Sequence, residues 1–202
     1  MIRAVICDDE TASLAIIRYL IESEGLPIEI VGTASNGQSG LELIQKEEPD
    51  LAFLDIQMPK MDGFEVLKKL KGSKTKVIFI TVYNTFAYAQ KSLRLGACDI
   101  IEKPIDVSSL RDSIVRAIGW NFTDSETLNR ALHHIYLHYS QALTLNELAE
   151  AACCTPSHLS HLFRQHFDMS VLSYIHKIRI AKAAQLLREG VSVQDGRLAI
   201  PV

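Results

Sequence analysis

Residues 51–70 have the sequence LAFLDIQMPKMDGFEVLKKL, which contains one complete strand–loop–helix unit. The unit opens with an apolar run at 51–54, which is typical of a strand buried on both faces of a sheet. A polar loop beginning at Asp55 follows, and Asp62 with Glu65 has the spacing of a capping box at a helix start. The stretch therefore predicts a buried strand that ends in an acid, followed by a helix.

Similar units occur on both sides of this stretch. The other apolar runs lie at 4–7, 28–34, 77–80 and 98–101, and helix-period segments lie at 12–23, 37–47, 62–71, 84–95 and 106–118. Five alternating strands and helices predict an α/β fold, a doubly wound five-stranded parallel sheet with helices on both faces. The run at 28–34 carries a charge and suits an edge strand, whereas the other runs fit buried central strands.

The composition limits the class of protein. The chain has 202 residues, of which 48% are hydrophobic and 22% charged, and this excludes a largely disordered or collagen-like chain and favours two modest domains. No run of 18 or more apolar residues occurs, and acids at positions 8–10 interrupt any signal sequence, so we expect a cytoplasmic protein without a membrane span. The four cysteines, at 7, 98, 153 and 154, form no C-x-x-C pair and indicate reduced thiols.

Residues 119–125 interrupt the strand–helix alternation, and only helical patterns follow. Thr123 with Glu126, and Thr144 with Glu147, predict helices that begin near 124 and 145. Thr155 before Pro156 predicts a third helix, and an amphipathic helix is expected over 171–189. The net charge is −4 over the first 125 residues and +1 over the rest, which also holds all seven histidines, so the two halves are expected to have different partners.

Polar residues gather where the predicted strands end. Asp8 and Asp9 end the first run, Asp55 the third and Thr81 the fourth, and Lys103 follows the fifth. In a doubly wound sheet these positions meet in one crevice, where three carboxylates would favour a shared hard cation such as Mg²⁺. An aspartate beside a metal, a lysine and a hydroxyl can accept a phosphoryl group. For any single acid, a helix cap or a solvated loop residue is the alternative interpretation.

These residues resemble the receiver domain of two-component response regulators, which has a flavodoxin-like fold. The similarity rests on Asp8-Asp9-Glu10, the segment 54–63, Thr81, Gly96-Ala97 and Lys103-Pro104, and it covers residues 1 to about 120. It implies that Asp55 is the phosphoacceptor. It also implies that Asp9, Asp55 and the Gln57 carbonyl bind Mg²⁺, that Asp8 helps through water, that Thr81 and Lys103 contact the phosphate, and that Lys103-Pro104 is a candidate cis bond. At the family's usual aromatic switch position this chain has Ile100, and Tyr83 is a candidate substitute.

The second half contains a candidate helix-turn-helix at 144–167. Apolar residues would pack the two helices together, while the second helix keeps an outward polar face of Ser157, His158, Ser160, His161 and Arg164, which are the candidate DNA contacts. Any antiparallel helix pair shows such a pattern. Residues 126–189 also resemble the first part of an AraC-type DNA-binding domain, with Asp168 in place of the usual glycine and without the pattern of the family's second helix-turn-helix.

The resemblance gives an expected organisation and function. We expect a receiver domain over 1–118, a linker over 119–125, the first half of an AraC-type domain over 126–190 and a tail over 191–202. The expected function is a DNA-binding transcriptional regulator that a sensor histidine kinase phosphorylates and that dimerises through residues 84–118 when phosphorylated. With one recognition helix, DNA binding is expected to be weak in the monomer.

Alternative interpretations remain open. One is a phosphorylation-sensing interaction module that has lost DNA binding. The other is an aspartyl-phosphate hydrolase, an enzyme whose two acids lie two residues apart on the first strand, a spacing that Asp8-Asp9 lacks. His134 and His138 lie four apart on one predicted helix and have the spacing of a shared metal, but the sequence places no third ligand near them.

Overall fold

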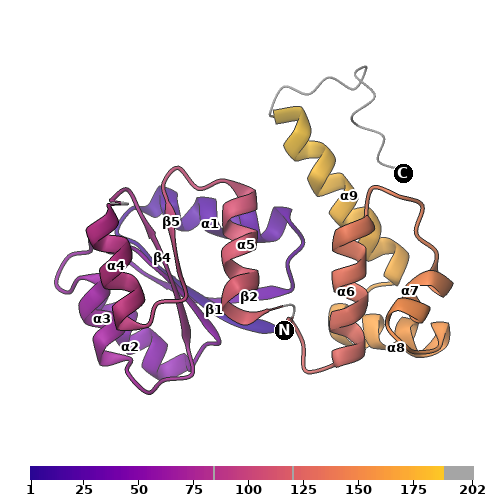
Figure 1. The fold of residues 1–202 in the computed structure, drawn as a ribbon, viewed down its shortest axis with the longest axis horizontal. Coiled ribbons are helices and arrows are strands. Elements are labelled where there is room, and N and C mark those ends of the chain that lie inside the picture. The colour runs from indigo at the N-terminus through magenta and orange to yellow at the C-terminus, as the bar shows by residue number, and fades with distance from the viewer. Residues whose placement is uncertain (84, 120, 189–202) are drawn as a thin grey trace. The chain divides into compact units, whose positions relative to one another are not determined.

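The computed structural model describes residues 1–83, 85–119 and 121–188, and in the last helix the side chains of 181 and 184–188 are not described. The predicted tail over 191–202 therefore lies outside the described residues. The chain forms two compact units (Figure 1), Met1–Leu20 with Pro27–Gly119 and Ile21–Leu26 with Trp120–Val202.

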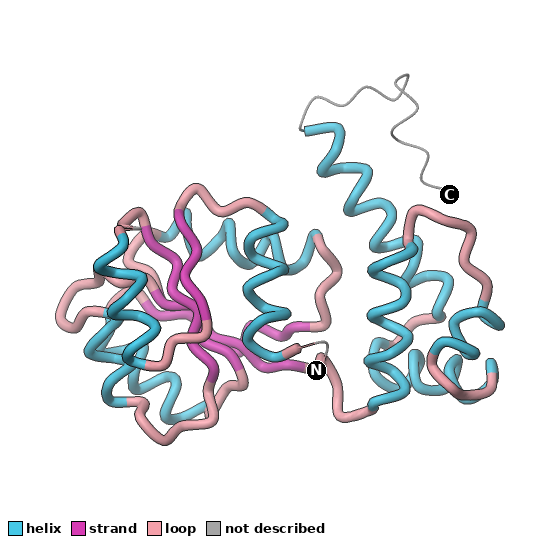
Figure 2. The backbone as a smooth tube through the Cα atoms, in the orientation of Figure 1, coloured by secondary structure: helices cyan, strands magenta, loops and turns pink. Residues whose placement is uncertain are grey.

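The first unit is built on one parallel sheet. Its strands are β1 (Ile2–Cys7), β2 (Ile28–Ala34), β3 (Leu51–Leu54), β4 (Lys76–Thr81) and β5 (Asp99–Glu102), in the order β2-β1-β3-β4-β5. Every pair of neighbours is parallel. The predicted doubly wound parallel sheet is confirmed, and Figure 2 shows its strands in magenta between helices.

The sequence predicted one of the two edge strands of the sheet correctly and the other incorrectly. The edge position predicted for β2 is confirmed, but the central position predicted for the run at 98–101 is wrong, because β5 is the other edge. Helices α4 and α5 both pack against β5. Helices that cover an edge strand let it keep apolar residues, and in β5 Ile101 is buried and Ile100 half-buried.

Five helices cover the sheet. They are α1 (Thr11–Ser23), α2 (Gly37–Glu47), α3 (Gly63–Lys69), α4 (Phe86–Leu95) and α5 (Val107–Ile118). In Figure 1, α2, α3 and α4 lie on one face and α1 and α5 on the other. Asp62 and Glu65 form the predicted capping box of α3, and Asp106 caps α5. Local caps therefore fix where the helices that follow β3 and β5 begin.

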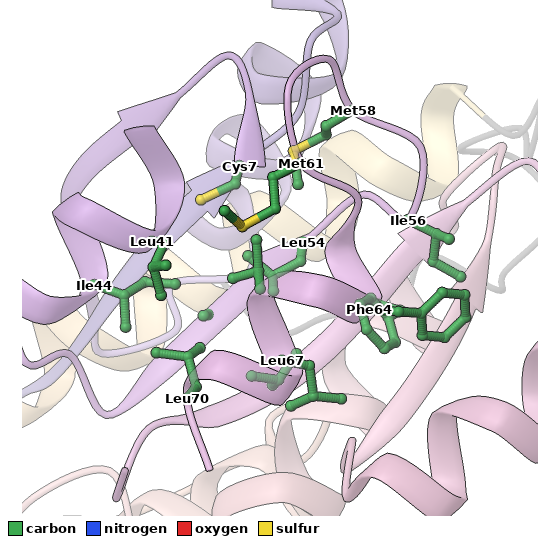
Figure 3. Packing of buried hydrophobic residues seen from close by; sticks show 14 of the residues in the cluster. Cys7, Leu41, Ile44, Leu54, Ile56, Met58, Met61, Phe64, Leu67 and Leu70 are labelled. Atoms are coloured by element: carbon green, nitrogen blue, oxygen red, sulfur yellow. The ribbon is translucent and has the colours of Figure 1, made fainter. Parts of the chain in front are cut away.

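Alternate residues of the central strands point into two cores. Val5, Cys7, Ala52 and Leu54 belong to a cluster that also contains residues of α2 and α3, such as Leu41, Ile44, Phe64 and Leu67 (Figure 3). The intervening residues Ile6 and Phe53 are equally buried on the opposite face. Because both faces of the sheet are covered here, residues 4–7 of β1 and 51–54 of β3 are apolar without interruption, and the acids of this region follow the strand ends.

Within residues 121–188, the described part of the chain after the first unit, the second unit forms four helices: α6 (Glu126–His138), α7 (Leu145–Ala151), α8 (Pro156–Phe167) and α9 (Val171–Arg188). Thr144 and Glu147 form the predicted capping box, and Thr155 caps α8 with Pro156 at its first turn. The box predicted for Thr123 and Glu126 is wrong, because Ser125 caps α6. The Thr123 hydroxyl and backbone instead bond to the buried Asn129 side chain.

Segment Ile21–Leu26 belongs to this second unit. The Tyr136 hydroxyl donates to the Glu24 carbonyl at 2.7 Å, and the Tyr174 hydroxyl donates to the Gly25 carbonyl at 3.0 Å. The Lys182 ammonium pairs with the Glu24 carboxylate, and both side chains are buried. Gly25 has φ +61°, and a Cβ there would lie 3.5 Å from Ile178. The turn is thus held by side chains from α6 and α9.

No described helix combines the length and the apolar composition that a membrane crossing requires.

Candidate functional site

The carboxyl ends of the strands bring the predicted site residues together. Asp8 and Asp9 follow β1, Asp55 follows β3, Thr81 ends β4 and Lys103 follows β5. Backbone hydrogen bonds continue past the ends of the strands. The Asp55 N–H donates to the Cys7 carbonyl at 2.8 Å, and the Lys103 N–H donates to the Thr81 carbonyl at 2.9 Å. The Lys103-Pro104 bond that follows is cis, as predicted. The sheet register therefore fixes the backbone at each of these positions.

Three carboxylates meet at this edge. Asp8, Asp9 and Asp55 each offer an oxygen, and the three atoms lie within 4.8 Å of one another; in the described parts of the chain this is the only such group of three. Asp8 and Asp55 are buried, 1% and 7% exposed, whereas Asp9 is exposed. We call these three residues the acidic cluster.

One lysine faces the acidic cluster. Lys103 Nζ lies 2.8 Å from Asp8 Oδ2 and 3.4 Å from Asp55 Oδ2. It also lies 3.4 Å from Glu10 Oε2. Glu10 directly follows the two predicted ligands, and sequence analysis assigned it no role. Glu10 is exposed and lies on the solvent side of Lys103. The Glu10 carboxylate also accepts from the Ser13 hydroxyl at 3.0 Å.

The electrostatics of the cluster follow from burial and like charge. Burial raises the pKa of Asp55, and the nearby Asp8 charge raises it further, while Lys103 acts in the opposite direction. Burial by itself would lower the pKa of Lys103, but the pairing with Asp8 and Asp55 raises it above its ordinary value. Lys103 therefore remains an ammonium and offsets only part of the negative charge.

The cluster fits a divalent cation. Asp8 Oδ2 is buried and has no partner of hydrogen-bonding geometry among the described residues, although Lys103 is close by. Three carboxylates against one ammonium leave a negative excess that a hard cation would neutralise, and few, partly hydrated oxygen ligands suit Mg²⁺. The acidic cluster is thus consistent with a metal site.

The loop after β3 approaches the sheet closely beside the cluster. A Cβ at Gly63 would lie 2.3 Å from the Asp55 carbonyl oxygen, so only glycine fits there. The Gln57 N–H donates to Asp55 Oδ1 at 3.3 Å, while the Gln57 side chain is exposed. An open cavity of about 520 Å³ adjoins this loop, lined in part by Asp9, Gln57 and Lys91. A small molecule can therefore reach the cluster from this side.

Thr81 ends β4, and Ile100 lies in the neighbouring strand β5. Thr81 is fully buried, and its hydroxyl accepts from the Tyr83 N–H at 3.2 Å. Ile100 is half-buried and packs against the core cluster of Figure 3. Tyr83 is 44% exposed and its ring stacks on Tyr88, with 6.3 Å between centroids. The backbone of Tyr83 is thus hydrogen-bonded to the Thr81 side chain, while the Tyr83 ring lies at the surface.

The second unit has the layout of a helix-turn-helix. Four residues separate α7 from α8, and Leu148, Leu159 and Phe163 are fully buried between the helices. The predicted DNA-facing residues lie on the other face of α8, where Ser157, His158, His161 and Arg164 are exposed and Ser160 is half-buried. Asp168 ends α8 with φ +53°, the left-handed conformation that the family's usual glycine provides.

Two family models match the chain. Residues 4–115 match the response regulator receiver domain, and residues 148–197 match a helix-turn-helix domain. The first match covers more than half of the chain and contains the whole acidic cluster, with Thr81 and Lys103.

Relatives of similar length support the same combination. A response regulatory protein of Staphylococcus epidermidis is 25% identical over 210 residues, which are 93% of this chain and 84% of that protein. The transcriptional regulatory protein HptR of Staphylococcus aureus is 24% identical over 211 residues, with the same coverage.

Solved structures match the first unit. The receiver domain of AraT, a response regulator from Geobacillus stearothermophilus, is 33% identical with a TM-score of 0.53, over 57% of this chain and 92% of that one. A chain of the CheX–CheY–BeF₃–Mg²⁺ complex from Borrelia burgdorferi is 27% identical with a TM-score of 0.53, over 56% and 87%.

The family assignment excludes the hydrolase alternative, because the matched families are regulators and not enzymes. The receiver match, the helix-turn-helix match and the transcriptional regulators that align along almost the whole chain agree with one another. The chain belongs to the response regulators, with a receiver domain followed by an AraC-type helix-turn-helix.

Proposed function

We propose that Asp55 accepts a phosphoryl group from a sensor histidine kinase and that this phosphorylation controls DNA binding and transcription. The observation that carries the proposal is the meeting of Asp55 with two further acids and Lys103 at the strand ends. A receiver implies a histidine kinase as donor, and a helix-turn-helix implies DNA as target. Such a pathway operates in the cytoplasm, where we place the protein.

The transfer uses the Asp55 carboxylate as nucleophile. An Asp55 oxygen attacks the phosphorus of a phosphohistidine, the P–N bond breaks, and the leaving imidazole takes up a proton. Asp9, Asp55 and the Gln57 carbonyl, with Asp8 acting through water, would hold Mg²⁺, which would supply neutralising charge to the phosphoryl oxygens. A chain similar to this one has been solved in a complex with BeF₃ and Mg²⁺, which supports this metal.

Lys103 and Thr81 hold the product. The Lys103 ammonium, 3.4 Å from Asp55 Oδ2, pairs with one oxygen of the aspartyl phosphate. The Thr81 hydroxyl donates to a second oxygen of the phosphate. To do so it rotates away from the Tyr83 N–H, which donates to it in this structure. Movement of Thr81 then changes the surroundings of Tyr83 and of the residues that follow.

The surface formed by residues 84–118 is the proposed dimer contact. Among the described residues of this region, Phe86 is 83% exposed and Leu93 is 70% exposed. Exposed apolar side chains of this size favour a protein contact. Phosphorylation-dependent dimerisation would bring two copies of α8 to one DNA site, as paired half-sites require.

We also propose the division into a receiver over 1–118, a linker over 119–125 and a helix-turn-helix region over 126–190. Within that region Ser157, His158, Ser160, His161 and Arg164 contact DNA. Arg164 is the strongest candidate, because a guanidinium can bind a guanine edge or a phosphate.

The central test is labelling of the full chain with a small acyl phosphate in the presence of Mg²⁺. We expect one acid-stable, base-labile phosphoryl group, lost in Asp55→Asn and kept in the control Asp62→Asn, which changes an acid in the same loop but preserves a helix cap. Retention of the label in Asp55→Asn would disprove the assigned acceptor. Lys103→Ala should still bind Mg²⁺, but it should accept the phosphoryl group poorly.

The DNA arm compares the phosphorylated protein with Arg164→Ala. Loss of one phosphate contact should lower the slope of log affinity against log salt by about 0.9, and loss of a base contact should cost about 1–3 kcal/mol at a specific site. Sedimentation of the phosphorylated and the unphosphorylated protein measures the fraction of dimer in each state. Equal DNA binding by wild type and Arg164→Ala would remove Arg164 from the interface.

A further inference from the structure

An open cavity of about 430 Å³ lies between α6 and α7 in the helical unit. It is lined in part by His134 and His138 of α6 and by Glu147 and Glu150 of α7. The proposed phosphotransfer uses none of these residues, and the proposed DNA contacts lie on α8. The cavity therefore combines imidazoles and carboxylates for which the proposed function gives no role.

The two histidines are arranged for joint binding. They are four residues apart on α6, so their side chains lie on the same face of the helix. Their ring centroids are 4.5 Å apart and the ring planes meet at 40°. Two imidazoles that bind one ion through nitrogens at about 2.0–2.1 Å have centroids roughly 5 Å apart, so a small adjustment of side-chain torsions places both on one metal.

The surroundings of His134 favour its neutral form, which is the form that binds metals. Burial lowers the pKa of His134, and the neighbouring His138 lowers it further, while Glu147 acts in the opposite direction. At neutral pH His134 therefore keeps a lone pair available for an ion.

Glu147 supplies a carboxylate from the opposite helix. One of its oxygens accepts from the Thr144 N–H at 2.8 Å in the capping box, and its charge is close enough to His134 for each to influence the other's pKa. The three ligand atoms are not yet within 4.8 Å of one another, a spacing that only the acidic cluster reaches among the described residues. Rotation of the Glu147 side chain, or a bridging water, would complete the set.

We propose that His134 and His138 bind one divalent transition-metal ion of the zinc class, with Glu147 as the ligand from α7. Imidazole nitrogens favour Zn²⁺, Ni²⁺ or Cu²⁺ over Mg²⁺, so this site differs in chemistry from the acidic cluster. The ion would tie α6 to the first helix of the helix-turn-helix. Binding to the folded form alone also raises its stability.

The test titrates the full chain with Co²⁺, a coloured substitute for Zn²⁺, in excess Mg²⁺ so that the acidic cluster is already saturated. We expect one equivalent to give visible absorption of nitrogen- and oxygen-ligated cobalt, and Zn²⁺ to displace it and raise the Tm of the helical unit. His134→Gln and His138→Gln should each abolish both signals. His133→Gln is the matched control, because His133 is on the same helix but does not line the cavity.

Glu147→Gln tests the ligand from α7 without removing the helix cap, since glutamine also completes a capping box. We expect its Co²⁺ affinity to fall roughly tenfold or more, with the metal-free Tm unchanged. Circular dichroism of every metal-free variant establishes that it is folded.

Three results would overturn the proposal. Binding by His134→Gln and His138→Gln equal to that of His133→Gln would exclude the histidine pair. Unchanged affinity in Glu147→Gln would exclude the ligand from α7. An intense near-ultraviolet thiolate-to-cobalt band would show that cysteines hold the ion.

Discussion

Two groups of charges among the described residues differ in their balance. In the helical unit one ammonium, Lys182, meets one carboxylate, Glu24, with side chains 8% and 2% exposed. In the receiver one ammonium, Lys103, faces the three carboxylates of the acidic cluster. The first group is neutral without a ligand, whereas the second keeps a negative excess that only a cation can offset.

This difference separates a structural ion pair from a binding site. A buried pair that is balanced needs no further partner, and tyrosine hydroxyls from α6 and α9 hold the backbone beside it. The carboxylates of the acidic cluster repel one another within the folded protein, and a bound cation would relieve that repulsion. Excess charge of one sign around a buried carboxylate is therefore the feature that points to function.

The largest expected effect comes from breaking the balanced pair. Lys182→Met removes the ammonium that Glu24 pairs with in the interior and should destabilise the helical unit by about 3–5 kcal/mol. Thermal unfolding followed by circular dichroism measures the loss, and amide hydrogen exchange of residues 21–26 should accelerate. The exposed Lys177 of the same helix provides the matched control, Lys177→Met.

The double variant Glu24→Met with Lys182→Met sharpens this test. Replacing both members of a buried pair with apolar side chains is often close to neutral, so the double variant should recover most of the stability. A double variant as unstable as Lys182→Met would mean that the pair contributes through its geometry rather than its charge balance.

A smaller effect, of opposite sign, is expected in the acidic cluster. Asp55→Asn removes a charge that burial and Asp8 disfavour, so it should stabilise the metal-free receiver by about 0.5–1 kcal/mol in urea unfolding at neutral pH. With saturating Mg²⁺ the order should reverse, because the wild type gains stability from the ion. Asp112→Asn, an exposed acid of α5, is the control. Loss of stability in Asp55→Asn without metal would contradict the excess-charge argument.

The smallest effect concerns an acid that is satisfied at the surface. Hydrogen bonds from Ser108 and then Ser109 lower the pKa of Asp106, the N-cap of α5, to about 2. Its contribution is complete above the unfolded-state pKa of about 3.9 and is lost as pH falls through about 2. Asp106→Ala should cost about 0.5 kcal/mol at neutral pH, the low end for loss of a cap because Asp106 is exposed, with the difference from wild type shrinking between pH 4 and pH 2.

Urea unfolding of wild type and Asp106→Ala across that pH range measures the change. Asp112→Ala, further along the same helix, should show little difference at any pH. A constant gap between wild type and Asp106→Ala down to pH 2 would show that the cap does not act through its charge.

Sequence patterns predicted elements whose causes are local. The apolar run at 51–54 and the box of Asp62 and Glu65 defined β3 and α3, because burial on both faces and capping depend on neighbours a few residues away. The capping box predicted for Thr123 and Glu126 does not form, because the hydroxyl of Ser125, two residues further along, caps α6 instead. The place of the run at 98–101 in the sheet depended on strand order, which no local pattern encodes.

By itself the sequence determined the two domain types, the acids at the strand ends and the polar face of α8, since side-chain periodicity and the direction of parallel strands follow from short spacings. Only the tertiary structure decided which charges are balanced. Glu24 and Lys182 are 158 residues apart, and Glu147 approaches His134 only after α7 has packed on α6. Such meetings depend on how the helices pack, which is set by the burial of many apolar side chains at once and not by the residues that meet.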